Sequence, residues 1–326
     1  MTCARLLGPA IFCAALAGLP WQTAGAQAYP DKPVRIVVPY VAGGNLDVTT
    51  RLFAEGLAVE LGQPFFVENR PGANGNTGTA QVARTPPDGY TLAMVSVGTM
   101  AINPALYRNM TFDPEKDLAP ISIISTAPMA LVASNSMPFR NMAELVAYAR
   151  ANPGKLNFGS GGIGTLAHLS AEMLRARTGI DIVHVPYKGA SLALNDAMAG
   201  NIQVVFDTLN TSAPLIRDGR LRAIAVTSGK RSAAFPNLPT IGEGGVNDYV
   251  AETWAGLVAP AGTPRETIMR LQTAVARIAA REQTQSRLAA VGSEAVAGTP
   301  EQFVTTLRAD RARWAEIVRI SGARAE

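Results

Sequence analysis

Three glycines in the stretch FGSGGIGT, from Phe158 to Thr165, have the G-x-G-x-x-G spacing that holds a pyrophosphate in dinucleotide-binding enzymes. Gly159, Gly161 and Gly164 follow a short strand pattern and precede a helical pattern. A dinucleotide site also needs an acidic residue at the end of the next strand, where it binds the ribose. The next strand, IDIVHVPY, has its only acid at its beginning. The spacing by itself is therefore weak support for a nicotinamide or flavin enzyme.

A second glycine-rich turn precedes a helix in VPYVAGGNLDVTTRLFAEGL, where Ala42, Gly43 and Gly44 turn the chain after a strand. The start of a helix has unpaired N–H groups and a partial positive charge, so it holds an anion without arginine or lysine. Glycine also lets an anion approach the main chain closely. Two such turns facing each other across a cleft predict a clamp for a small carboxylate.

Hydrolytic and metal chemistry have little support in the sequence. There is no G-x-S-x-G motif, and a triad would have to use His168 or His184; Ser160, His168 and Asp207 are one set that could in principle approach each other. The other histidine, His184, is interpreted as a strand residue on a solvated or partly packed surface. Two histidines without cysteine do not form a metal-binding cluster. We therefore expect no catalytic residue, no metal and no cofactor.

The elements that position these turns alternate between short β-rich segments and helical patterns, which predicts an α/β fold with largely parallel sheets. Strands are expected at residues 34–38, 65–68, 91–95, 121–125, 129–133, 156–158, 182–185, 202–206, 222–227 and 254–258. Helices are expected at residues 47–61, 142–151, 165–177 and 192–199, and roughly the last 60 residues have a purely helical pattern. Thr263 with Glu266 and Thr299 with Gln302 have the capping-box pattern around a proline.

Two short crossings divide the chain into two domains. The first is SIISTAPMALVA, near Thr126, and the second is DYVAETWAGLVAP, near Thr253. Two crossings mean that one domain is inserted into the other. We expect residues 29–126 plus 253–326 to form lobe 1, and residues 127–252 to form lobe 2.

The first 28 residues have the layout of a secretory signal peptide, with an early arginine, an apolar run and small residues in A-x-A order. Cleavage is expected after Ala26 or Ala28. Both cysteines, Cys3 and Cys13, lie in this segment, so disulfide or thiol chemistry is not expected in the mature chain. The net charge is only +4 and no basic run occurs, which makes nucleic acid an improbable partner.

The chain resembles the periplasmic solute-binding receptors of tripartite tricarboxylate transporters, the Bug or TctC-like family. The resemblance is carried in order along the mature chain by YPDKPVRIVVPYVAGG, GQPFFVENRPGANGNTG, PDGYTL, INPALYRNMTFDPEKDL, NPGKLNFGSGG, VHVPYKG, LRAIAVTS, KRSAAFPNLPTIGEGG, WAGLVAPAGTP and GTPEQF. It implies a two-lobed type II periplasmic binding protein, or Venus flytrap, with two doubly wound domains joined by two hinge crossings. Such a receptor captures an organic acid and delivers it to a membrane permease.

The resemblance also implies which residues bind the ligand. From the two lobes these are Tyr40, Ala42, Gly43, Gly44, Asn45, Ser96, Thr99, Ser160, Gly161, Ile163, Thr165 and His168. Asp207 matches an acid at the pocket edge, where it would receive an amino or hydroxyl group of the ligand. An equally supported interpretation is that Asp207 accepts main-chain N–H bonds at a strand end.

The sequence departs from the family pattern at Val41, Asn45 and Thr208, and the amide of Asn45 adds a donor and an acceptor at the first turn. We expect a periplasmic monomer whose partners are a small organic acid and permease subunits. Two alternatives are a ligand-sensing receptor for a signalling system and, with less support, a dinucleotide-dependent enzyme. The identity of the carboxylate stays open at this point.

Overall fold

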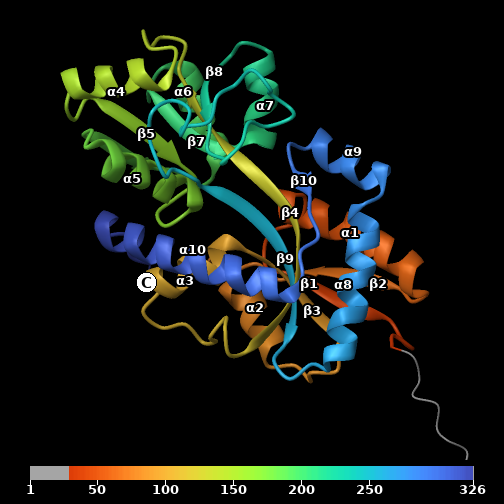
Figure 1. Ribbon diagram of the computed structural model, residues 1–326. Helices are drawn as coiled ribbons and strands as arrows, with labels where there is room; N and C mark the ends of the chain where they lie inside the picture. Colours follow the sequence, from red (N-terminus) through yellow and green to blue (C-terminus); the bar gives the residue numbers. More distant parts are fainter. Residues whose placement is uncertain (1–28, 326) are drawn as a thin grey trace, which may run out of the picture.

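The computed structural model describes residues 29–325 and shows two α/β lobes connected by long strands (Figure 1). The signal peptide predicted for residues 1–28 lies outside the described residues. No helix of the described part is long and apolar enough to cross a membrane.

The strands alternate with helices along most of the chain, as the sequence pattern predicts. The strands are β1 Val34–Val38, β2 Phe65–Asn69, β3 Thr91–Ser96, β4 Leu118–Ala133, β5 Leu156–Ser160, β6 Ile182–Pro186, β7 Val204–Thr208, β8 Arg222–Val226, β9 Glu252–Pro260 and β10 Glu294–Ala295. The helices are α1 Asn45–Leu61, η1 Ala73–Gly75, α2 Asn76–Ala83, η2 Gly98–Ile102, α3 Asn103–Leu106, α4 Met142–Ala151, α5 Leu166–Thr178, α6 Ala190–Ala199, α7 Leu209–Arg217, α8 Arg265–Ala279, α9 Glu282–Ala290 and α10 Pro300–Ser321.

One curled sheet runs through both lobes in the order β2-β1-β3-β9-β4-β7-β5-β6, with β8 and β10 also paired to β4. Within each lobe the outer strands are parallel: β1 with β2 and β3, and β5 with β6 and β7. The pairs that involve β4 or β9 are antiparallel. The two sheets expected from the sequence are therefore continuous, because β4 is long enough to contribute to both.

Strand β4 changes its partners where it passes from one lobe to the other. Up to Pro128 it pairs with β9, and from Met129 to Ala133 it pairs with β7 and β8. Proline has no N–H to donate to a neighbouring strand, so it is tolerated where a ladder changes. The sequence predicted one strand before this proline and another after it. The structure instead has a single strand of 16 residues that runs through the proline.

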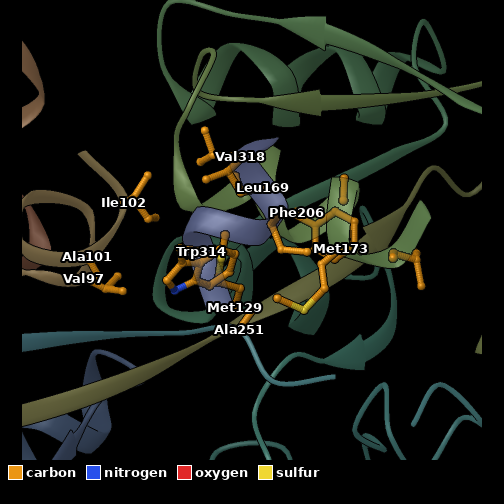
Figure 2. Packing of buried hydrophobic residues seen from close by; sticks show 14 of the residues in the cluster. Val97, Ala101, Ile102, Met129, Leu169, Met173, Phe206, Ala251, Trp314 and Val318 are labelled. Carbon is orange, nitrogen blue, oxygen red and sulfur yellow. The ribbon is translucent and has the colours of Figure 1, made fainter. Parts of the chain in front are cut away.

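The C-terminal helix α10 packs against both lobes, in addition to the strands that connect them. It packs against η2 and α3 of one lobe and against α5 of the other. Figure 2 shows its Trp314, which is fully buried, in one hydrophobic cluster with Ile102 on one side and Leu169 and Phe206 on the other. Lobe orientation therefore depends on buried apolar contact as well as on the connecting strands.

Two local predictions near the C-terminus have different outcomes. The capping box at Thr299 and Gln302 is confirmed, with both reciprocal hydrogen bonds present. The box predicted at Thr263 is wrong, because that hydroxyl donates to the carbonyl of Pro260 at 2.7 Å and α8 begins at Arg265. The C-terminal segment also contains the short strand β10, so it is not purely helical.

Candidate functional site

A cavity of about 370 Å³ lies against the strands that connect the lobes. Its lining comes from the first glycine turn and the start of α1, the ends of β3 and β7, the middle of β4 and the start of β9. The lining residues are Tyr40, Val41, Gly44, Asn45, Leu46, Asp47, Ser96, Ser125, Ala127, Thr208, Thr253, Trp254 and Ala255. Of these, Ala127 and Thr208 belong to the part of the chain predicted as lobe 2.

The start of α1 supplies main-chain donors to this cavity. The glycine turn needs Gly43 because its φ is +83°, a conformation that residues with a Cβ rarely adopt. The main-chain N–H groups of Gly44, Asn45 and Leu46 have no acceptor within residues 29–325, and all three residues line the cavity. This arrangement is the anion-binding geometry of a helix N-terminus.

Asp47 holds the glycine turn in place. Its carboxylate accepts the N–H of Gly43 at 2.9 Å and an amide hydrogen of Asn69 at 2.9 Å, and it pairs with Arg51 at 3.0 Å. Burial raises the pKa of Asp47, but the hydrogen bonds from Arg51, Gly43 and Asn69 outweigh burial and keep the pKa below its usual value. Because the Gly43 N–H is already bonded to Asp47, it is not available to a ligand.

The hydroxyl of Tyr40 is fully engaged beneath the cavity. It contacts Ser96 Oγ at 3.0 Å, Thr99 Oγ1 at 2.9 Å and the carbonyl oxygen of Asn74 at 3.3 Å. Gly75 is required beside it, because a Cβ there would lie 2.7 Å from Thr99 Oγ1 and 3.0 Å from the Tyr40 hydroxyl. These bonds fix the aromatic ring as a wall of the cavity.

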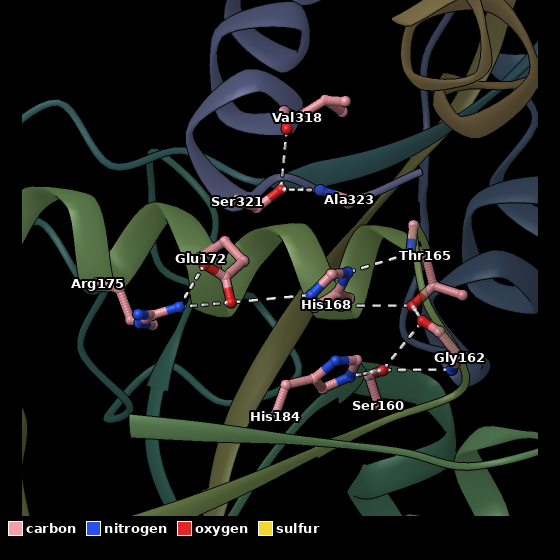
Figure 3. Close-up of polar contacts among 11 residues, drawn as sticks. Ser160, Gly162, Thr165, His168, Glu172, Arg175, His184, Val318, Ser321 and Ala323 are labelled. Atoms are coloured by element: carbon pink, nitrogen blue, oxygen red, sulfur yellow. Dashed lines mark hydrogen bonds and ion pairs between the residues drawn. The ribbon is translucent and has the colours of Figure 1, made fainter. Parts of the chain in front are cut away.

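The second glycine-rich turn follows β5 and is held by its own polar side chains (Figure 3). Ser160 Oγ lies 2.7 Å from His184 Nε2 and donates to the carbonyl of Gly162 at 3.0 Å. Thr165 caps α5 by accepting the His168 N–H at 3.3 Å. Ser160 is fully buried, so it is not positioned to attack a substrate.

His168 is also buried and orients the same turn. Its Nδ1 accepts the Gly164 N–H at 3.1 Å, and its Nε2 lies 3.7 Å from Glu172, which pairs with Arg175. The ring stacks on His184 with centroids 3.9 Å apart. Burial lowers the pKa of His168 to about 4, with the neighbouring His184 adding to the effect, and burial lowers the pKa of His184 to about 4. Both rings are therefore neutral near pH 7.

The glycines of FGSGGIGT serve close packing. A Cβ at Gly159 would lie 2.5 Å from Ile202 and 2.9 Å from Ala193, so this glycine allows α6 to pack on β5. Gly164 has φ +74°, and a Cβ there would overlap the side chain of Leu106 in α3. The turn therefore touches the opposite lobe at Gly164.

The structure brings some of the predicted ligand-binding residues together and separates others. Tyr40, Gly44, Asn45 and Ser96 line the cavity, Ala42 and Gly43 belong to the same turn, and Thr99 lies behind Tyr40. Outside the lining are the residues of the second turn and the acid: Ser160, Gly161, Ile163, Thr165, His168 and Asp207. Asp207 is buried and accepts hydrogen bonds from Thr211 and, at 3.2 Å, from Ser212. Burial raises the pKa of Asp207 despite these bonds.

Sequence reasoning missed three residues that shape the site. Asp47 had a usable signal, since an acid in the first turn of a helix is a common stabilising feature. Asn69 and Trp254 had none, because they reach the site only through strand pairing and the crossing of β9. Within the described residues, no group of three or more histidine, cysteine or acidic side chains is placed to hold a metal ion.

Comparisons with known proteins agree with this geometry. Residues 49–322 match the family described as Tripartite tricarboxylate transporter family receptor, TctC. BugT of Bordetella pertussis is 34% identical over 300 residues, which cover 92% of each chain. The structure of Rpa4515 of R. palustris with adipate is 36% identical, has a TM-score of 0.80 and covers 90% of this chain and 98% of that one. MatC from Rhodopseudomonas palustris with bound malate is 29% identical, with a TM-score of 0.76 and coverage of 89% and 100%.

The two solved relatives have the two-lobed fold of periplasmic solute-binding proteins, and each was solved with a dicarboxylate. The family is one of solute-binding receptors and not of enzymes. From the family match, the fold and the cavity beside the connecting strands, we conclude that this chain belongs to the TctC family of tripartite tricarboxylate transporter receptors.

Proposed function

We propose that the protein captures a small organic carboxylate in the cavity between its lobes and delivers it to membrane permease subunits, without catalysing a reaction. One observation carries this proposal: Gly44, Asn45 and Leu46 line the cavity with main-chain N–H groups that have no acceptor within residues 29–325. A carboxylate at this helix start accepts these hydrogen bonds and meets the positive end of the helix dipole.

The remaining walls indicate the chemistry of the ligand. Apolar side chains dominate them: Val41, Leu46, Ala127, Trp254 and Ala255. No lysine, arginine or histidine lines the cavity, and its only charged lining residue is Asp47, which is already paired with Arg51. We therefore propose an acid with a carboxylate at one end and an apolar body packed against Trp254, in preference to a compact tricarboxylate.

The second glycine-rich turn is proposed as the opposing jaw. The N–H groups of Leu166 and Ala167, at the start of α5, have no acceptor within the described chain. Gly164 already touches Leu106 of the other lobe. Rotation about β4 and β9 is the motion that would bring this turn over a bound acid, and it is the kind of hinge closure that two-lobed receptors use.

A thermal-shift panel tests the ligand class directly. Ligand at a hundred times its Kd stabilises a protein by about 2.7 kcal/mol, which is a readily measured shift in Tm. We expect hexanoate, adipate and benzoate to raise Tm more than citrate does at equal concentration. Stabilisation by NADH, together with no response to any acid of the panel, would overturn the receptor proposal.

Gly44→Val tests the anion site. A Cβ at Gly44 would have its nearest neighbour at 3.7 Å, and the φ of −74° suits any residue, so the variant is expected to fold. Its side chain enters the cavity and blocks the approach of a carboxylate to the N–H groups. The matched control is Gly242→Val, outside the cavity, where the nearest neighbour of a Cβ is at 3.6 Å. We expect calorimetric binding to be lost in the first variant and kept in the second.

Export and assembly have their own measurements. We propose a periplasmic monomer whose signal peptide, residues 1–28, is removed on export. Mass spectrometry of the periplasmic fraction should give a chain that starts at Gln27 or Tyr29, and light scattering should give one chain per particle. Uptake of labelled acid by vesicles that contain the permease should require the receptor.

A further inference from the structure

A second cavity, of about 670 Å³, is formed by residues of the predicted lobe 1 and, unlike the carboxylate cavity, has basic side chains in its lining. It is lined by Ala73, Asn76, Thr77, Tyr107, Arg108, Asn109, Met110, Thr111, Arg324 and Ala325. No acidic residue is among them. Arg108 and Arg324 are both exposed, and neither has a carboxylate partner within residues 29–325, so two guanidinium groups of the described chain border this space outside any ion pair of that range.

A buried amide adds an unused donor to the same cavity. Asn76 is 8% exposed, and its oxygen accepts a hydrogen bond from the amide of Asn103 at 2.7 Å. The amide nitrogen of Asn76 has no acceptor within the described chain. This nitrogen is not one of the buried side-chain atoms without a partner, so it is accessible from the cavity and can donate to a ligand oxygen there.

Other lining groups also donate hydrogen bonds. Burial raises the pKa of Tyr107, which keeps its phenol protonated. Thr77, Asn109 and Thr111 add hydroxyl and amide groups that can donate further hydrogen bonds. Guanidinium groups bind carboxylate and phosphate oxygens through paired hydrogen bonds, and two of them suit a ligand with more than one such group.

We propose that this cavity is a second binding site, which takes a small polyanion with two or more phosphate or carboxylate groups. Arg108 and Arg324 each bind one oxyanion group, and the Asn76 amide donates to an oxygen between them. The carboxylate cavity, by contrast, has no basic side chain, so the two sites select ligands of different charge.

A hydrogen-bonded chain connects the two cavities. Asn103, fully buried, donates from one amide nitrogen both to Asn76 and, at 3.0 Å, to the carbonyl of Asn74. The same carbonyl accepts the hydroxyl of Tyr40, a wall of the carboxylate cavity, at 3.3 Å. Asn74 lies in the 3₁₀ segment between the two cavities and has φ +50°, in the left-handed region. A polyanion on Asn76 therefore acts on the same loop that supports Tyr40.

Titration of the purified full chain with inorganic pyrophosphate, by calorimetry in phosphate-free buffer, tests the site. The test variant carries Arg108→Gln with Arg324→Gln. The control variant carries Arg220→Gln with Arg308→Gln, which removes two exposed positive charges elsewhere. Loss of two charged hydrogen-bond partners should weaken binding at least about tenfold in the test variant, and the control should stay within about twofold of the wild type.

Two more variants separate the possible outcomes. Asn76→Asp keeps the shape of the side chain but adds a negative charge, so it should also weaken pyrophosphate binding. Gly44→Val, which blocks the carboxylate cavity, should bind pyrophosphate as the wild type does. Equal affinity in the wild type and the test variant, loss of binding in Gly44→Val, or no binding of pyrophosphate by the wild type would each overturn the proposal.

Discussion

Acidification from about pH 7 to about pH 5 should destabilise the folded protein through the stacked pair of His168 and His184. Burial lowers the pKa of each ring to about 4, whereas an unfolded histidine has a pKa near 6.5. The unfolded chain therefore binds more protons than the folded chain in this window. The contribution of the neutral histidines to the free energy of unfolding is fully present above the pKa of the unfolded chain. It is lost as the pH falls towards the pKa of the folded chain.

The magnitude follows from the two pKa values. For one histidine with a pKa of 6.5 unfolded and about 4 folded, the loss between pH 7 and pH 5 is about 2 kcal/mol. His168 should show most of this loss because it is only 6% exposed. Solvent reduces the share of His184, which is only partly buried. Protonation of His168 also removes the acceptor of the Gly164 N–H, so the second glycine turn should loosen together with the loss of stability.

Urea unfolding, followed by tryptophan fluorescence at both pH values, measures the effect. Buried Asp207 and Asp310, whose pKa values are raised by burial, oppose the trend because they take up protons in the folded state. The comparison is therefore with a variant carrying His168→Gln and His184→Gln, which keeps these acids. The free energy of unfolding of the wild type should fall by about 2 kcal/mol more than that of the variant. An equal fall in both proteins would refute the reasoning.

Three further substitutions test the site and the contact between the lobes. Asn69→Ala removes the hydrogen bonds that the Asn69 amide donates to Asp47 and to the carbonyl of Tyr40. It should therefore lower the free energy of urea unfolding by about 1–3 kcal/mol and weaken carboxylate binding. Unchanged affinity would contradict the positioning role of Asn69. Gly164→Val should lower Tm, because residue 164 has a positive φ and the new side chain would overlap Leu106. Adding Leu106→Ala should recover part of this loss, and no recovery would show that the overlap is unimportant. The carboxylate of Asp207 accepts hydrogen bonds from Thr211 and Ser212, so Asp207→Asn should destabilise the protein by about 1–3 kcal/mol. Calorimetry should show less than about a threefold change in ligand affinity. A larger loss of affinity would show that Asp207 binds the ligand.

The local pattern of the chain predicted the elements well where hydrophobic periodicity and caps agree. The strand at Val34–Val38 and the helix at Met142–Ala151 have the predicted bounds. The β-branched run in the first and the Asn141 cap of the second are local signals that need no tertiary context. The first glycine turn was predicted for the same reason, since a positive φ at Gly43 is a local requirement.

The second glycine turn shows where local reasoning ends. Its G-x-G-x-x-G spacing is compatible with a dinucleotide loop, but Gly159 is needed for packing of α6 and Gly164 for contact with Leu106. Neither neighbour is close in sequence. The stacking of His168 on His184 likewise depends on how α5 lies over β6, which no spacing in the sequence reveals.

The sequence by itself determined the α/β class, the two crossings and the helix start that offers N–H groups to an anion, because these features depend on neighbouring residues. Only the tertiary structure decided that β4 and β9 join the lobes into one sheet, that Asp47 and Asn69 hold the turn, and that Trp254 forms a wall of the cavity. The physical reason is that a cavity is formed by residues from separate strands and turns, and their proximity is set by pairing and packing across the whole chain.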